Sequence, residues 1–148
     1  MKMEISRRKI TMPSDLLTVN FHKIMQSKFY TVFILSCLDK RFAIYTDPKV
    51  GQNIQTFLAE KPRPRPHTYD LINHLLKGLD IHLLQTVIYD VQDTVYFSRL
   101  FVEQQIDDKK HLLEIDARPS DCLSLALMNN IPIFCKKDIL DKIINIQD

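Results

Sequence analysis

The chain has 148 residues, of which 45% are hydrophobic and 26% are charged. This length and balance fit one globular domain with its own core and argue against a disordered or disulfide-stapled protein. The formal net charge of +2 is too small to indicate a nucleic-acid partner by itself. No apolar signal-peptide segment follows the basic N-terminus, and the longest apolar stretch, residues 30–38, is too short to span a bilayer. We therefore expect no membrane association.

The three cysteines, Cys37, Cys122 and Cys135, lie far apart in the sequence and form no C-x-x-C pair. This spacing predicts neither a zinc site nor a redox dithiol. Each cysteine lies in an apolar segment, which is typical of a buried free thiol. Free thiols are typical of a reducing compartment, so we expect a cytoplasmic protein.

Two segments differ from the globular pattern, one at the N-terminus and one in the middle of the chain. We expect residues 1–15, which contain Arg7-Arg8-Lys9, to form a basic tail and residues 16–148 to form the domain. Residues 61–66 read Lys-Pro-Arg-Pro-Arg-Pro, and three prolines exclude a helix or a central strand there. This run predicts an extended connector between two halves that share one core.

The first half begins with apolar, β-branched and aromatic segments that predict strands at residues 16–22, 30–38 and 41–46. Asp47-Pro48 is a typical helix start, with the aspartate as N-cap and the proline at the first helical position. The helix that follows runs to about Ala59 and is weakened by Gly51.

The second half begins with a helix that Thr68 can cap, with leucines at helical spacing and Gly78 just past its end in the left-handed position. Strands are predicted at residues 83–89, 94–102, 111–117 and 131–135. Pro119-Ser120-Asp121 starts a helix to about Asn129 that is apolar nearly all round and therefore buried, and a last helix covers residues 137–144. The pattern predicts a single α+β domain with a mixed, mostly antiparallel twisted sheet and about four helices.

Two polar segments, residues 65–70 and 116–121, share one arrangement. Each places an arginine before a helix, a hydroxyl at the expected N-cap and an aspartate in the first turn; the residues are Arg65, Thr68 and Asp70, and Arg118, Ser120 and Asp121. A structural interpretation accounts for all of them, since the hydroxyl caps an amide, the aspartate complements the helix dipole and the arginine pairs with the aspartate.

A functional interpretation uses the same atoms. Helix N-termini and arginines bind phosphate oxygens, whereas aspartates repel phosphate unless a hard cation such as Mg²⁺ or Mn²⁺ lies between them. Asp70, Asp116 and Asp121 could hold such a cation, which would activate water for hydrolysis. Composition and spacing leave both interpretations open.

The second segment and its surroundings resemble a known family. Residues 116–127 are similar to the D-A-R-P-S-D-A-[IL]-x-L-A-L signature of the bifunctional nuclease domain family. Residues 65–71 resemble the family's R-P-x-T-H-D-L segment, residues 95–100 its T-F-Y-A-x-L strand and residues 131–134 its P-I-[FY] strand. The resemblance covers about residues 16–141.

The resemblance implies a nuclease that acts on DNA and RNA with a divalent metal, Mg²⁺ or Mn²⁺, and that forms a homo-oligomer, most simply a dimer. Phosphate would be bound by Arg65, Arg118 and Ser120; catalysis would fall to Asp116, Asp121, Asp70 and His67, with Asp116 and Asp121 as the metal ligands and His67 as a candidate for proton transfer.

The chain departs from the family pattern at two places. Tyr69 stands where the family has histidine, and its helical spacing predicts a place at the edge of the core. Val50 stands where the family has glutamate, and Asp47 where it has glycine. The chain therefore lacks an imidazole and a carboxylate of the kind that general acid–base catalysis uses. The alternative is therefore a regulatory module that keeps the fold and binds nucleic acid or protein without hydrolysis.

Overall fold

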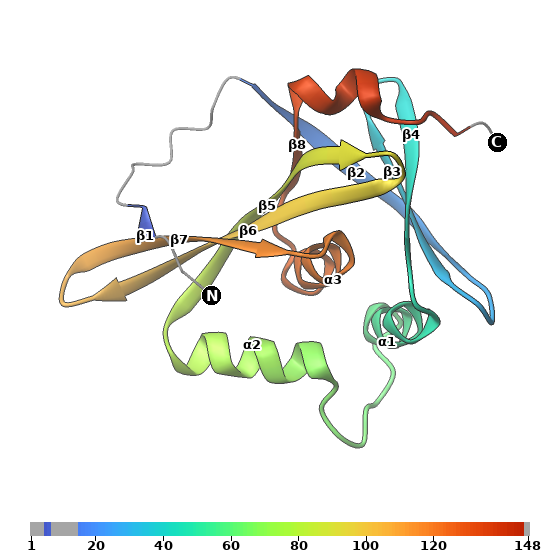
Figure 1. Cartoon of the computed structure of the whole chain (residues 1–148). Coiled ribbons are helices and arrows are strands. Elements are labelled where there is room, and N and C mark those ends of the chain that lie inside the picture. Colours follow the sequence, from blue (N-terminus) through green and yellow to red (C-terminus); the bar gives the residue numbers. More distant parts are fainter. Residues whose placement is uncertain (1–4, 7–14, 147–148) are drawn as a thin grey trace.

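The computed structural model describes residues 5–6 and 15–146, so the basic cluster at residues 7–9 lies outside the described residues. The strands form one twisted sheet that is mixed and mostly antiparallel, which confirms the predicted α+β fold (Figure 1). Across the sheet the order is β1 (Ile5–Ser6), β7 (Lys109–Ala117), β6 (Val95–Ile106), β5 (Ile81–Gln92), β8 (Ile133–Lys136), β2 (Leu16–Gln26), β3 (Thr31–Cys37) and β4 (Lys40–Thr46).

Strand β8 joins the two halves of the sheet. It pairs antiparallel with β2, where Leu17 faces Cys135, and parallel with β5, where Val87 faces Phe134. On either side of it, β2–β3–β4 and β5–β6–β7 are antiparallel. At the far edge, Ile5 and Ser6, which belong to the segment expected as a tail, pair with β7.

Within residues 15–146 the helices are α1 (Pro48–Leu58), α2 (Thr68–Gly78) and α3 (Pro119–Asn129), together with the 3-10 helix η1 (Lys137–Lys142). The three α-helices lie on the lower side of the sheet in Figure 1, with α3 packed against β4, β5 and β6, while η1 lies at the top of the view. The last helix is therefore shorter and more tightly wound than the predicted one. Within residues 15–146, no helix has the length and apolar character needed to cross a membrane.

Helix α1 starts as the sequence predicts. Asp47 is its N-cap, and the Asp47 carboxylate accepts hydrogen bonds from the amides of Lys49 at 3.0 Å and Val50 at 3.2 Å. Gly51 has a packing role, because its amide donates to Thr31 Oγ1 at 3.1 Å and the helix passes directly over β3. A side chain would not fit there: a Cβ would lie 2.3 Å from Thr31 Oγ1.

The other two helix starts differ from the prediction by one or two residues. His67, not Thr68, is the N-cap of α2, because the Asp70 carboxylate accepts from the His67 amide at 2.8 Å and closes the first turn one residue earlier. Arg118, not Ser120, is the N-cap of α3, because Pro119 takes the first helical position that its fixed φ favours.

The end of α2 also differs. Gly78 is the last helical residue and has no positive φ, and the left-handed step falls at Asp80, with φ of 53°. Aspartate tolerates that conformation, so the chain needs no glycine there. A glycine was therefore a poor marker of this turn.

The core forms between α3 and the sheet. Leu123 of α3 is 1% exposed and packs in one cluster with Ile88 and Val102 of the neighbouring strands. All three cysteines are free and buried, as predicted, and burial raises the pKa of Cys122. The predicted all-round apolar character of α3 is confirmed, and it fixes the start of this helix firmly against the sheet.

Candidate functional site

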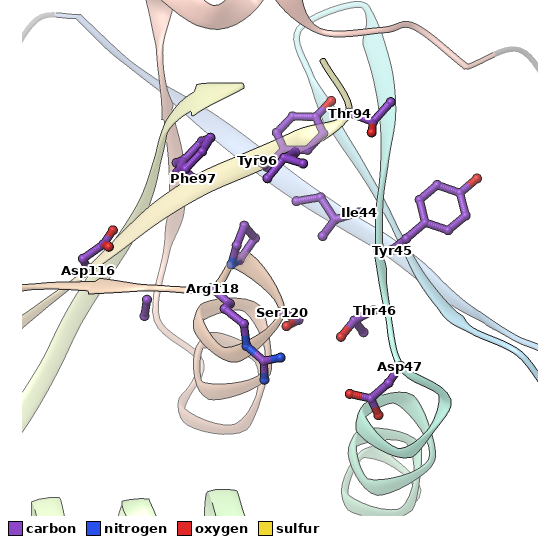
Figure 2. Close-up of a pocket in the computed structure, with 13 residues that line it drawn as sticks. Ile44, Tyr45, Thr46, Asp47, Thr94, Tyr96, Phe97, Asp116, Arg118 and Ser120 are labelled. Carbon is purple, nitrogen blue, oxygen red and sulfur yellow. The ribbon is translucent and has the colours of Figure 1, made fainter. Parts of the chain in front are cut away.

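A pocket of about 900 Å³ opens where β4 ends, β6 begins and β7 turns into α3 (Figure 2). Three predicted site residues, Asp116, Arg118 and Ser120, line it together. The other lining residues are Ile44, Tyr45, Thr46, Asp47, Thr94, Val95, Tyr96, Phe97, Ala117 and Pro119. Residues 116–120 of the signature segment therefore face a hollow large enough for a small ligand or a segment of a polymer.

Arg118 lies at the mouth of this pocket. Its side chain is 66% exposed, and its guanidinium makes two hydrogen bonds to Asp121, from Nε to Oδ2 at 2.8 Å and from Nη2 to Oδ1 at 3.1 Å. This fork raises the pKa of Arg118 above its ordinary value, so the guanidinium is charged at every physiological pH. Figure 2 shows it directed into the space between α3 and the start of α1.

Tyr69 joins the two motifs. Its ring is buried at 7% exposure, as predicted, and its hydroxyl donates to Asp121 Oδ1 at 2.7 Å from α2 across to α3. Burial first, and then the neighbouring carboxylate, raise the pKa of Tyr69 well above its usual range. Tyr69 is therefore a neutral hydrogen-bond donor at physiological pH, and it cannot serve as a general base.

Asp121 is consequently held from two sides. Burial works to raise the pKa of Asp121, but hydrogen bonds from Arg118 and Tyr69 outweigh it, and the pKa is lowered from its ordinary value. The carboxylate stays ionised, and both of its oxygens already accept hydrogen bonds.

Asp116 and Ser120 complete the predicted group. Asp116 is exposed at the end of β7, and one of its oxygens accepts from the Tyr89 hydroxyl at 3.2 Å. Ser120 is 4% exposed in the first turn of α3, where its carbonyl accepts from Ser124 Oγ at 2.6 Å. Of these carboxylates, Asp116 is the one with an open side facing the pocket.

Asp70, another predicted site residue, belongs to a second group. Arg63, rather than Arg65, makes the paired hydrogen bonds to Asp70, from Nε to Oδ2 at 2.9 Å and from Nη2 to Oδ1 at 2.6 Å. Burial works to raise the pKa of Asp70, but the His67 amide and Arg63 lower it overall. Arg63 also lies over the ring of Phe57, 5.3 Å from its centroid.

This second group lines a separate hollow of about 630 Å³ between the end of α1 and the start of α2. Asp70 lines that hollow and not the pocket that holds Arg118. His67 lines neither of the two. Arg65 is exposed, and within residues 15–146 it has no hydrogen bond or ion pair.

A metal held jointly by Asp116 and Asp121 does not fit this arrangement. Within the described part of the chain, no three His, Cys, Asp or Glu side chains come together in a way that could hold an ion. Asp121 would first have to release Arg118 and Tyr69, which leaves Asp116 as the available ligand.

Sequence reasoning missed Asp47 as a pocket residue. Asp47 was predicted only as a cap, yet it also lines the pocket and its charge contributes to the raised pKa of Arg118. Its position at the junction of β4 and α1 was the available signal, because the pocket is built from such junctions. Val50, by contrast, is 8% exposed in the core and does not line the pocket.

Comparison with known proteins agrees with the motif evidence. The family model described as the bifunctional nuclease domain matches residues 33–146. Two proteins of Mycobacterium tuberculosis, from strains CDC 1551 / Oshkosh and H37Rv, are each 32% identical over 77 residues, and both are named only as uncharacterized. The matched stretch is 52% of this chain but only 43% of each relative, so most of each relative lies outside the match.

Proposed function

Because the chain belongs to the bifunctional nuclease domain family, we propose that it hydrolyses phosphodiester bonds of DNA or RNA at the pocket in front of α3. The observation that carries this proposal is the Arg118 guanidinium, which is exposed on its pocket side and anchored to Asp121 on the other. An arginine held this way is suited to bind phosphate oxygens, because little side-chain freedom is lost on binding.

The donors at this end of α3 match an anion. Arginine has five N–H groups, and Asp121 accepts from only two of the guanidinium nitrogens of Arg118. Pro119 has no amide hydrogen, and the amides of Asp121 and Cys122 bond back to the Arg118 carbonyl. The amide and hydroxyl of Ser120 are therefore the first-turn groups that supplement the guanidinium.

The acidic residues of the pocket require a counter-charge. Among the described residues, Asp47 and Asp116 line it together with Arg118, so these three side chains present a net negative charge to an entering phosphate. A divalent ion, Mg²⁺ or Mn²⁺, would offset this charge and lower the pKa of a water bound to it. Asp116 is the residue that would hold it, because its carboxylate is exposed.

A second candidate function is nucleic-acid binding without hydrolysis. Tyr69 replaces the family histidine with a group that cannot act as a base, and Val50 replaces the family glutamate with a buried apolar side chain. Both changes remove groups that acid–base catalysis uses. For this second function we propose a regulatory domain that acts in the cytoplasm as a homodimer.

Cleavage assays separate the two functions. Labelled single-stranded DNA, duplex DNA and RNA are incubated with purified protein in Mg²⁺, Mn²⁺ or EDTA, beside Arg118→Gln and Asp116→Asn. Lys110→Gln is the matched control, since it removes one positive charge from a side chain that is 71% exposed outside the pocket.

Under the proposal, cleavage needs the metal, survives in Lys110→Gln and falls at least about tenfold in Arg118→Gln, a loss of about 1.4 kcal/mol of transition-state stabilisation. Salt-dependent binding without cleavage would establish the second function. A folded protein that neither binds nor cleaves any of the three substrates would contradict both.

A further inference from the structure

An exposed Arg–Asp pair one turn apart on a helix is ordinarily a weak contact. Such pairs contribute little because both side chains remain free to move in water. Arg118 and Asp121 have this (i, i+3) spacing, and the arginine is 66% exposed. The pair alone therefore does not explain a fixed guanidinium.

The difference lies behind the carboxylate. Asp121 is 30% exposed, and its Oδ1 accepts both from the buried Tyr69 hydroxyl at 2.7 Å and from Arg118 Nη2 at 3.1 Å. The tyrosine reaches it from another helix, and the two residues are 52 positions apart in the sequence. This contact fixes the orientation of the carboxylate group. The bidentate hydrogen bond then holds the guanidinium in a matching orientation.

Tyr69 is itself held in place. Its ring belongs to the buried core, and the next residue, Asp70, is tied to Arg63 and to the His67 amide. The second Arg–Asp pair therefore secures the start of α2 beside the tyrosine. The two similar motifs have different tasks in this geometry: one anchors a helix, and the other presents a charged group to the pocket.

We infer that Tyr69 is a positioning residue that orients Arg118 for phosphate through Asp121, an inference that rests on the proposed function for its substrate. The hydroxyl is the part of Tyr69 that does this, while the ring packs in the core. The raised pKa of Tyr69 supports the assignment, since the proton stays on the hydroxyl throughout the physiological range.

The test is Tyr69→Phe, which removes the hydroxyl and keeps the ring. The matched control is Tyr30→Phe. Tyr30 does not line the pocket, and its hydroxyl makes no hydrogen bond to residues 15–146. Both proteins carry the same chemical change, so a difference between them reports on the contact with Asp121.

Two measurements are made on each protein. The first is the solvent-exchange rate of the Arg118 Nε–H group by NMR, which reports directly on the bond to Asp121. The second is the affinity for a labelled single-stranded phosphorothioate oligonucleotide, which resists cleavage, in the presence of Mn²⁺. It is measured also in Arg118→Gln and in the Tyr69→Phe/Arg118→Gln double variant.

The expected result is faster exchange and about tenfold weaker binding in Tyr69→Phe, which corresponds to about 1.4 kcal/mol. Tyr30→Phe is expected to change neither the exchange rate nor the affinity. In the Arg118→Gln background, Tyr69→Phe has no further effect on affinity, because the two residues act through one contact.

Unchanged Nε–H exchange in Tyr69→Phe, or losses of affinity that simply add in the double variant, would overturn the inference while leaving the proposed function intact. If the wild-type protein binds no oligonucleotide, the proposed function fails, and the exchange rate still decides whether Tyr69 orients Arg118.

Discussion

Replacing Gly51 with alanine is expected to destabilise the domain, although glycine-to-alanine changes inside helices usually stabilise. The usual gain is about 1 kcal/mol from helix propensity and reduced freedom of the unfolded chain. At Gly51 the new methyl group would lie 2.2 Å from Gln26 Oε1 and 2.3 Å from Thr31 Oγ1. Gln26 can move its flexible end, but Thr31 is 0% exposed in β3 and cannot.

The cost can be estimated from the contacts that must give way. Overpacking of this kind costs roughly 1–3 kcal/mol. Separating the helix from Thr31 also strains two hydrogen bonds of the Thr31 hydroxyl, from the Gly51 amide at 3.1 Å and to Gln26 at 3.0 Å, each worth about 1 kcal/mol. After the propensity gain, the net loss is about 3 kcal/mol, or a fall in melting temperature of roughly 6–12 °C.

Urea unfolding of the wild type, Gly51→Ala and Gly78→Ala measures the change in the free energy of unfolding. A Cβ on Gly78 would meet no heavy atom within 4 Å, and this residue has no positive φ, so its alanine variant should gain about 0.5–1 kcal/mol. Opposite signs for the two glycines are the expected result. If Gly51→Ala is as stable as the wild type or more stable, the close approach of α1 to β3 does not constrain this position and the reasoning is refuted.

Three further predictions concern buried charges and thiols. Asp70→Asn should lower the free energy of unfolding by about 3 kcal/mol in urea titrations, because Arg63, 22% exposed, loses its ionised partner; Asp90→Asn, which removes a more exposed pair with Lys142, should cost under about 1 kcal/mol. Since the pKa values of Asp70 and Asp121 are lowered on folding, their stabilisation is complete above about pH 5 and is lost as the pH falls through the lowered values. The melting temperature should therefore fall less steeply with decreasing pH in Asp70→Asn than in the wild type. The three buried cysteines should react with a thiol reagent only after denaturant is added, and rapid reaction of the native protein would contradict their burial.

Much of the fold could be predicted because its elements have strong local patterns. The apolar run of α3 and the Asp47-Pro48 start of α1 were recognised from residue type and spacing alone. Helix starts were less predictable where two capping rules competed. Ser120 is a good N-cap type, but Pro119 at the first helical position moved the cap to Arg118.

The part of the site that could be predicted is the part carried by one short segment of the chain. Asp116, Arg118 and Ser120 come together because one strand-to-helix turn carries all three. The Tyr69–Asp121 contact depends on how α2 packs against α3, and no local pattern encodes that. The exchange of Arg65 for Arg63 has a similar origin, since the path of the proline-rich connector decides which arginine meets Asp70.

The place of β8 in the sheet bears on how the chain folds. The two antiparallel halves can each form from nearby segments. Among the described strands, β8 (Ile133–Lys136) is the one that pairs with both halves, and it comes last in the sequence. Pairing Leu16 with Lys136 closes a long loop, a step that is slow compared with hairpin formation. Until it is complete, β2 and β5 present open edges to other chains, so the time before β8 inserts is when the chain is most exposed to aggregation.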